Sequence, residues 1–264
     1  MHAVTQRRAR VGRAEIYYEV AGRGSPLVLI HGLSGSGRWW AHNRPALARR
    51  HRVYTVDLVG FGRSRCDHPF ALAAAAATLA AWMRQVGIGP AHVVGHSMGG
   101  HIAADLAADE PGLVERLVLV DAAAIPFDLA CVPRPLDALR CLAGLSPGYL
   151  GLLLTDAASA GLPTIARAAL DLLRADIRPK LERIRAQTLV VWGERDVLVP
   201  LRLGRELARS IPGATLAVFP GTGHSPMIER PATFNRVVAD FLRSGVVSPD
   251  GRAPRAGRRL VVSS

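Results

Sequence analysis

The stretch from Val93 to Gly100, which reads Val-Val-Gly-His-Ser-Met-Gly-Gly, constrains the fold of this chain more than any other. Its first residues are apolar and β-branched, as in a buried strand, and the residues that follow it favour a helix. Gly95 and Gly99 lie two positions before and after Ser97, where side chains would collide with neighbouring backbone in a tight turn. The pattern Gly-x-Ser-x-Gly therefore predicts a strand, a sharp turn and a helix, with the Ser97 hydroxyl at the apex.

The rest of the chain repeats this alternation of strand and helix. We predict eight strands, at 8–11, 14–20, 27–30, 52–56, 91–95, 116–120, 188–192 and 215–219. Between them lie helical segments at 70–86, 97–108, 201–210 and 228–243. Such an order is typical of an α/β fold with a doubly wound, mostly parallel sheet. Residues 1–121 and 179–243 form its predicted core.

Residues 122–178 interrupt the alternation after the sixth predicted strand. They contain helical patterns broken by prolines, many leucines, and five aspartates balanced by five arginines. An insertion at this point lies at the carboxyl ends of the strands, where α/β sheets bind ligands. We therefore expect a helical cap, or lid, over the site. Residues 244–264 are rich in Gly, Pro, Arg and Ser and predict a mobile basic tail.

The net charge of +12 raises the question of a nucleic-acid partner. Residues 1–13 contribute +4 and residues 243–264 contribute another +4, so most of the charge lies at the two ends. No basic stripe with interleaved aromatic residues is present, and we expect no nucleic-acid partner. No apolar run reaches the roughly 20 residues of a membrane span, and the N-terminal segment has no apolar signal region. The expected location is the cytoplasm, as a monomer or homodimer with three free cysteines.

A serine hydroxyl becomes a good nucleophile only when a base takes its proton. His224 is the candidate base, because it follows the strand at 215–219 in a loop of small residues and comes after Ser97 in the chain. Asp196 follows the strand at 188–192 and is the candidate acid that orients the imidazole. Asp121, at the end of the strand at 116–120, is the alternative acid, or else a cap at the start of the insertion.

Five pieces of sequence, in order, carry a resemblance to the α/β-hydrolase superfamily over about residues 10–243. They are His31-Gly32, Asp57–Ser64, Gly95–Gly100, Gly193–Asp196 with Val199-Pro200, and Gly223-His224. The resemblance implies a cofactor-free enzyme with Ser97 as nucleophile, Asp196 as acid and His224 as base. It also implies an oxyanion hole made by the backbone N–H groups of Leu33 and Met98.

Two other polar residues end strands that precede Ser97. We interpret His31 as a residue that shapes its own loop, and Asp57 as one that ties down the loop at 60–64 by side-chain to backbone bonds. His92, His96 and His101 do not share one helix face and have no carboxylate or cysteine at ligand spacing, so we predict no metal.

The predicted substrates are carboxylic esters, including lactones and thioesters, with short to medium apolar acyl groups. The candidate pocket residues are Trp40, Phe61, Phe127, Tyr149 and Met227. One alternative is a carbon–carbon bond hydrolase of aromatic degradation. Those enzymes usually have Gly-Pro-Gly after the His-Gly pair and asparagine before the serine, whereas this chain has Ser34–Gly37 and His96. A second alternative is a small-ligand receptor on the same fold, which would bind but not turn over its ligand.

Overall fold

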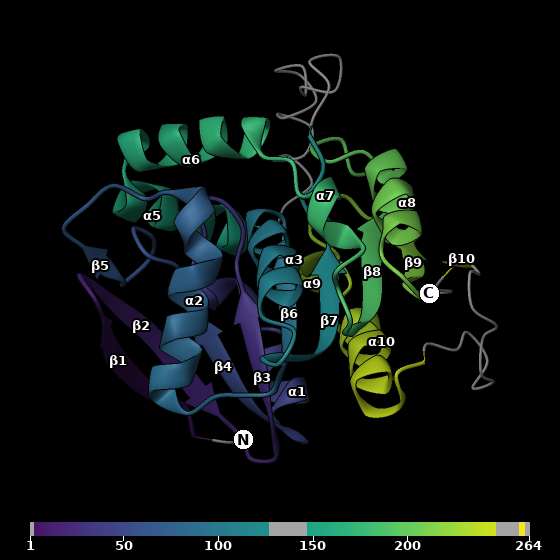
Figure 1. Cartoon of the computed structure of the whole chain (residues 1–264), viewed down its shortest axis with the longest axis horizontal. Coiled ribbons are helices and arrows are strands. Elements are labelled where there is room, and N and C mark those ends of the chain that lie inside the picture. The colour runs from purple at the N-terminus through teal and green to yellow at the C-terminus, as the bar shows by residue number, and fades with distance from the viewer. Residues whose placement is uncertain (1–2, 127–146, 247–258, 262–264) are drawn as a thin grey trace.

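The computed structural model describes residues 3–126, 147–246 and 259–261 (Figure 1). One ten-stranded sheet runs through it, in the order β1-β2-β4-β3-β6-β7-β8-β9-β10, with β5 paired to β2. The strands are β1 (Thr5–Val11), β2 (Ala14–Ala21), β3 (Ser25–Ile30), β4 (His51–Val56), β5 (Arg65–Cys66), β6 (Ala91–His96), β7 (Val114–Val120), β8 (Gln187–Gly193), β9 (Thr215–Phe219) and β10 (Arg259–Val261).

Helices connect the strands. The helices of the described residues are η1 (Gly37–Trp40), α1 (Arg44–Leu47), α2 (Leu72–Val86), α3 (Met98–Asp109), α5 (Pro147–Ala160), α6 (Leu162–Arg174), α7 (Arg178–Leu181), α8 (Leu201–Ser210), α9 (Pro226–Glu229) and α10 (Pro231–Ser244). Within the described residues, no helix is long and apolar enough to cross a membrane.

The predicted α/β class and the mostly parallel sheet are confirmed. From β4 along the sheet to β10 the neighbouring strands run parallel, and the antiparallel pairs are those of β2 with β1, β4 and β5. All eight predicted strands are present, but the sheet is larger than predicted by β5 and β10. Both are too short, at two and three residues, to give a periodic pattern in the sequence. β10 lies within the range expected to be a mobile tail.

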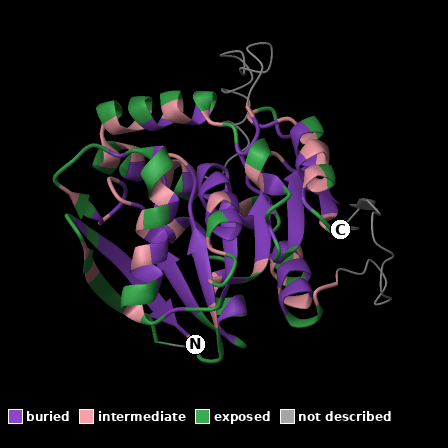
Figure 2. Ribbon diagram, in the orientation of Figure 1, coloured by how far each residue is buried: buried purple, intermediate pink, exposed green. Residues whose placement is uncertain are grey.

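The sheet separates two hydrophobic cores. Along β3, Val28 and Ile30 pack with α2, α3 and α8 on one face, whereas Leu27 and Leu29 pack with η1 and α10 on the other. All four side chains are fully buried, because a parallel sheet covered on both faces exposes neither. Figure 2 shows the central strands buried and the outer faces of the helices exposed. Because helices cover both faces of the sheet, polar side chains can gather at the carboxyl ends of the central strands.

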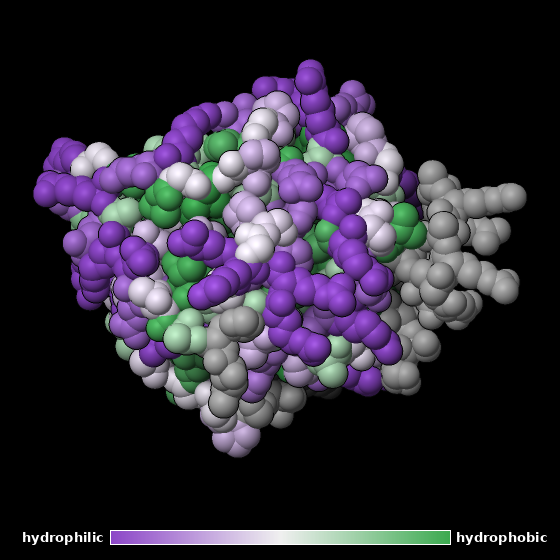
Figure 3. All heavy atoms as spheres, turned by 90° about the horizontal axis from the view of Figure 1, so that it is seen from below, coloured by the Kyte–Doolittle hydropathy of each residue, from purple (hydrophilic) through white to green (hydrophobic). Residues whose placement is uncertain are grey.

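The insert, residues 122–178, leaves the sheet after β7 and returns before β8. Its described helices α5 and α6 lie across the ends of the strands (Figure 1). The Ile177 N–H donates to the carbonyl of Ala124 at 3.3 Å, so the entry and exit of the insert lie together. The opposite face of the molecule, in Figure 3, is largely hydrophilic with scattered hydrophobic patches.

Candidate active site

Ser97 occupies the predicted sharp turn between β6 and α3. Its φ of 53° and ψ of −118° lie outside the regions that residues with a side chain favour, at a cost of about 1–3 kcal/mol. The turn is held by the Ser97 N–H, which donates to Val120 O at 2.9 Å, and by the Ala123 N–H, which donates to Ser97 O at 3.1 Å. A Cβ on Gly95 would lie 2.2 Å from the carbonyl of Gly99, so the turn requires glycine there.

The loop after β3 lies against this turn. A Cβ on Gly32 would come within 3.0 Å of the Ser97 Cβ, which places the backbone of the next residue, Leu33, beside the serine. Met98 begins α3, and the N–H groups of a helix's first turn have no acceptor within the helix. Among the described residues, neither the Leu33 nor the Met98 N–H has a protein acceptor. Neither N–H group is therefore used by the described part of the fold, and their role as oxyanion donors stays a prediction.

His31 and Asp57 shape this edge of the sheet, as the sequence indicated. The buried ring of His31 accepts the Leu58 N–H at Nε2 (2.9 Å), and its Nδ1 donates to Gly32 O (2.7 Å). Burial lowers the pKa of His31, which agrees with a neutral ring in this role. Asp57 accepts the N–H groups of Gly37 and Arg63 at 2.7 and 2.8 Å, so it ties two loops to one carboxylate.

Asp196 and His224 meet beyond the ends of β8 and β9. The imidazole Nδ1 donates to Asp196 Oδ2 at 2.7 Å, while Asp196 Oδ1 accepts the N–H groups of Leu198 and Val199 at 2.8 and 2.9 Å. Asp196 is buried and His224 is half-buried. Because Nδ1 is occupied by the carboxylate, the lone pair of the imidazole lies on Nε2, the nitrogen that must accept a proton from a nucleophile.

His96 joins the two halves of the site. Its Nε2 donates to the carbonyl of His224 at 2.7 Å, and the two rings lie tilted at 55° with centroids 4.8 Å apart. Burial is the main cause that lowers the pKa of His96 well below its usual value, so the ring is neutral. From the sequence, His96 was interpreted as a departure from the asparagine of other enzymes and as an unsuitable metal ligand, and this contact was not predicted. Its position directly before Ser97, at the end of a buried strand, was the available signal.

Asp121 also lies in this cluster. Its carboxyl group, that of Asp196 and the His224 ring bring oxygen and nitrogen atoms within 4.8 Å of one another. The alternative acid and the preferred acid are therefore neighbours, although only Asp196 hydrogen-bonds the imidazole.

The five candidate pocket residues fall in different places. Tyr149 of α5 is buried against Trp39, and burial raises its pKa above the usual value. Trp40 and Met227 are fully buried on the face of the sheet that α10 covers, and Trp40 packs against Phe234. Phe61 packs against Phe70. Phe127 lies outside the described residues.

Trp39, rather than Trp40, lies beside the histidines. Its ring is 5.8 Å from those of both His96 and Tyr149, and its Nε1 donates to Asp156 Oδ2 at 3.0 Å. Asp156 of α5 is fully buried, accepts Ser36 Oγ at 2.8 Å and pairs with Arg38. The sequence did not predict this contact between the insert and the loop after β3. The one signal for it was a lone carboxylate, Asp156, within the apolar run of α5.

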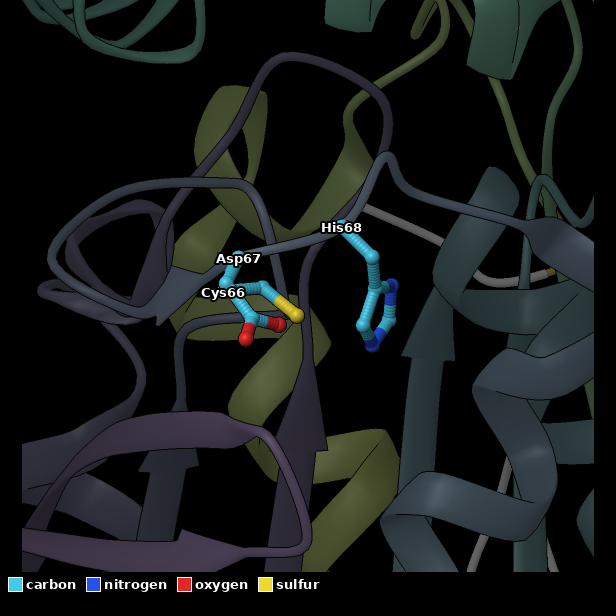
Figure 4. A group of neighbouring side chains, drawn as sticks. All are labelled: Cys66, Asp67 and His68. Carbon is cyan, nitrogen blue, oxygen red and sulfur yellow. The ribbon is translucent and has the colours of Figure 1, made fainter.

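Three potential metal ligands lie together at the end of β5 and in the loop that follows it, where Figure 4 shows Cys66, Asp67 and His68. Both Asp67 oxygens accept Arg13 Nε, at 2.8 and 3.0 Å, and this bond lowers the pKa of Asp67. The carboxylate therefore already has a cationic partner.

The chain is similar to proteins of known family. The model of the Alpha/beta hydrolase family matches residues 27–237. The chain is 32% identical to "Putative carbamate hydrolase RutD" of Caulobacter sp. (strain K31), over 86% of this chain and 95% of that protein. It is 31% identical to the 2-hydroxy-6-oxo-6-phenylhexa-2,4-dienoate hydrolase of Burkholderia cepacia, over 87% and 92%.

Among solved structures, a thermophilic esterase from Thermogutta terrifontis superimposes with a TM-score of 0.78 at 27% identity, covering 90% of this chain and 98% of that one. The match of the family model extends from β3 through the turn at Ser97 to α10, and so spans every element of the cluster described above. The chain belongs to the alpha/beta hydrolase family, and it is a hydrolase.

Proposed function

We propose that the protein is a serine hydrolase that cleaves carboxylic esters through an acyl-enzyme on Ser97. The observation that carries this proposal is the 2.7 Å hydrogen bond between Asp196 and His224 Nδ1, which leaves Nε2 as the only imidazole acceptor. His96, the residue before the strained serine, donates to the backbone carbonyl of His224. Ser97 follows β6, Asp196 follows β8 and His224 follows β9, so the proposed nucleophile, acid and base all lie beyond the carboxyl ends of strands of one sheet.

The chemistry follows from these positions. Ser97 Oγ attacks the ester carbonyl while His224 Nε2 takes the hydroxyl proton, and Asp196 stabilises the imidazolium. The Leu33 and Met98 N–H groups bind the oxyanion of the tetrahedral intermediate. The intermediate collapses, and His224 gives the proton to the departing alkoxide. Water then attacks the acyl-enzyme by the same route, returning the free acid and the Ser97 hydroxyl.

Apolar acyl groups of short to medium length fit the surroundings of His224 best. The rings of Trp39 and Tyr149 meet edge to face at 5.8 Å and are both buried. On the side of the insert, these two rings offer carbon atoms and no charged group. Tyr149 adds one hydroxyl on the same side. Lactones and thioesters react by the same steps, so they belong to the same proposed class.

Substitution of Ser97 by alanine tests the proposal. Hydrolysis of p-nitrophenyl esters of graded chain length should fall by about 10⁴-fold or more, because the nucleophile is lost while the fold remains. Ser210→Ala, which removes a hydroxyl bonded only within α8, is the matched control and should keep full turnover. Steady-state turnover by Ser97→Ala would refute the nucleophile. Stoichiometric binding without turnover by the unmodified protein would favour a receptor.

Cleavage of a carbon–carbon bond is the second candidate, because the Burkholderia cepacia relative has that kind of substrate in its name. The same serine, histidine and oxyanion donors serve this chemistry. A vinylogous 1,5-diketone assayed beside the esters separates the two, since the larger kcat/KM identifies the class. A carbamate belongs in the same panel because of the Caulobacter relative.

A further inference from the structure

Asp121 presents an unusual carboxyl group at the end of β7. The residue is fully buried and its backbone takes a φ of 41°, which side-chain-bearing residues rarely adopt. Its N–H donates to Val191 O at 3.0 Å, so the backbone is fixed against β8. Oδ1 accepts the Gly193 N–H at 2.8 Å. Oδ2 is buried and has no hydrogen-bond partner among the described residues.

A buried oxygen without a hydrogen-bond partner lowers the stability of the native state, and more so when it carries charge. The neighbour that matters is Asp196, because the carboxyl oxygens of the two residues lie within 4.8 Å of each other. Two carboxylates at this separation in a buried site cannot both keep their charge cheaply, and one of them takes up a proton.

The hydrogen-bond donors decide which carboxyl group stays ionised. Asp196 accepts three N–H donors, from Leu198, Val199 and His224. Asp121 accepts one, from Gly193. Hydrogen bonds to a carboxylate favour its charged form, so the negative charge belongs on Asp196 and the proton on Asp121.

The surrounding charges act in the same direction. Burial raises the pKa of Asp121 well above its usual value, the charge of Asp196 raises it further, and Glu229 of α9 adds to this. His224 faces the pair from the loop after β9, and the neutral His96 lies behind it on β6. No cation among the described residues pairs with the Asp121 carboxyl group to oppose the proton.

We propose that Asp121 carries a proton in the resting protein, and that this neutral carboxyl group fills the space beside Asp196 without adding a second negative charge near His224. The inference rests on the proposed function for its catalytic meaning. A second negative charge here would favour imidazolium, which cannot accept the Ser97 proton. A neutral carboxyl group fills the same space and keeps His224 available as a base.

The first test uses Asp121→Asn, which copies a neutral carboxyl group in size and retains a donor. The acid limb of its kcat/KM profile for a p-nitrophenyl ester should shift by less than about 0.3 pH unit, with turnover reduced less than about tenfold. Asp196→Asn is the counterpart and should lose about 10³-fold or more. A downward shift of about one unit or more in Asp121→Asn would show that Asp121 is ionised. Equal damage by the two variants would make Asp121 the acid. Either result overturns the proposal.

The second test needs no substrate and no variant. The carboxyl carbon of Asp121, followed by ¹³C NMR in the unmodified protein, should keep the shift of a protonated acid at pH 7. A shift typical of a carboxylate at pH 7 overturns the proposal even if the variant fails to fold. If esters are not hydrolysed but the carboxyl group is protonated, the proposed function fails and the protonation stands. Loss of activity after dialysis against EDTA, restored by Zn²⁺, would instead make the cluster a metal site.

Discussion

His96 connects the strand that carries the nucleophile to the loop that carries the base. Its single hydrogen bond to the His224 carbonyl is buried, and its other nitrogen, Nδ1, has no partner among the described residues. The ring therefore contributes a donor and a ring contact, but no charge. Its hydrogen bond ties the backbone of His224 to the strand that ends before Ser97.

Replacement of His96 by phenylalanine keeps the ring and removes the donor. We expect kcat/KM for an ester to fall about tenfold, mainly through kcat, because one buried hydrogen bond contributes about 1.4 kcal/mol to the placement of His224. His92→Phe is the control, since His92 is buried near the start of β6, at the opposite end of the strand from Ser97, and meets the ring of His51 edge to face. Steady-state kinetics of both variants give the comparison. Equal losses would mean that the effect is only structural.

At the level of single residues, sequence motifs were sufficient to predict the candidate catalytic groups. Ser97, Asp196 and His224 follow their strands as predicted, and the structure adds a hydrogen bond between the last two. The proximity of Asp121 to Asp196 was not predictable, because it depends on β7 and β8 being neighbours. The choice of Trp40 over Trp39 reflects a short 3₁₀ helix, in which adjacent side chains diverge in directions that sequence does not specify.

At the level of elements, the Asp156 carboxylate fixes α5 to the loop after β3. Asp156 bonds Ser36 and Trp39, which lie shortly after Leu33 in that loop. The position of the insert and the shape of this loop are therefore coupled. Sequence predicted the helical nature of the insert from its proline-broken pattern, but not this contact, which joins residues 120 positions apart.

Removal of the Asp156 carboxylate should weaken this attachment. In Asp156→Ala, the Ser36 hydroxyl and the Trp39 Nε1 lose their buried acceptor, and we expect the free energy of unfolding to fall by about 3 kcal/mol. Urea denaturation measures this, and hydrogen exchange should show faster opening of α5. Asp176→Ala is the control, because Asp176 pairs only with Arg178 at the surface and should cost less than about 1 kcal/mol. Unchanged protection of α5 in Asp156→Ala would contradict the coupling.

At the level of the whole molecule, the sheet and its loops bury several histidines as neutral rings. Burial is the main cause that lowers the pKa values of His31, His51, His92, His96 and His101. For His51 the pKa falls from 6.5 to about 4. The unfolded chain thus binds more protons than the native protein below pH 6.5. Asp121, with its raised pKa, opposes this by a single proton.

Stability should therefore decline as the pH falls from 6.5 toward 4. We expect the free energy of unfolding from urea melts to drop by at least about 1.4 kcal/mol per pH unit in this window, the value for a single proton. His51→Phe removes one of these rings and should give a shallower decline. His42→Phe, at an exposed position, should keep the original slope. A stability that stays constant or rises between pH 6.5 and 5 would show that the native histidines are charged.

The meeting of Ala124 and Ile177 has a consequence for how such proteins diversify. Because the insert begins and ends at nearly one point, between two strands that are already neighbours, it is a module with coincident ends. Exchange of residues 125–176 for the corresponding part of another family member would leave the register of the sheet and the elbow untouched. In such a hybrid we expect the catalytic groups to come from the protein that supplies the sheet, and the substrate preference to come from the protein that supplies the insert.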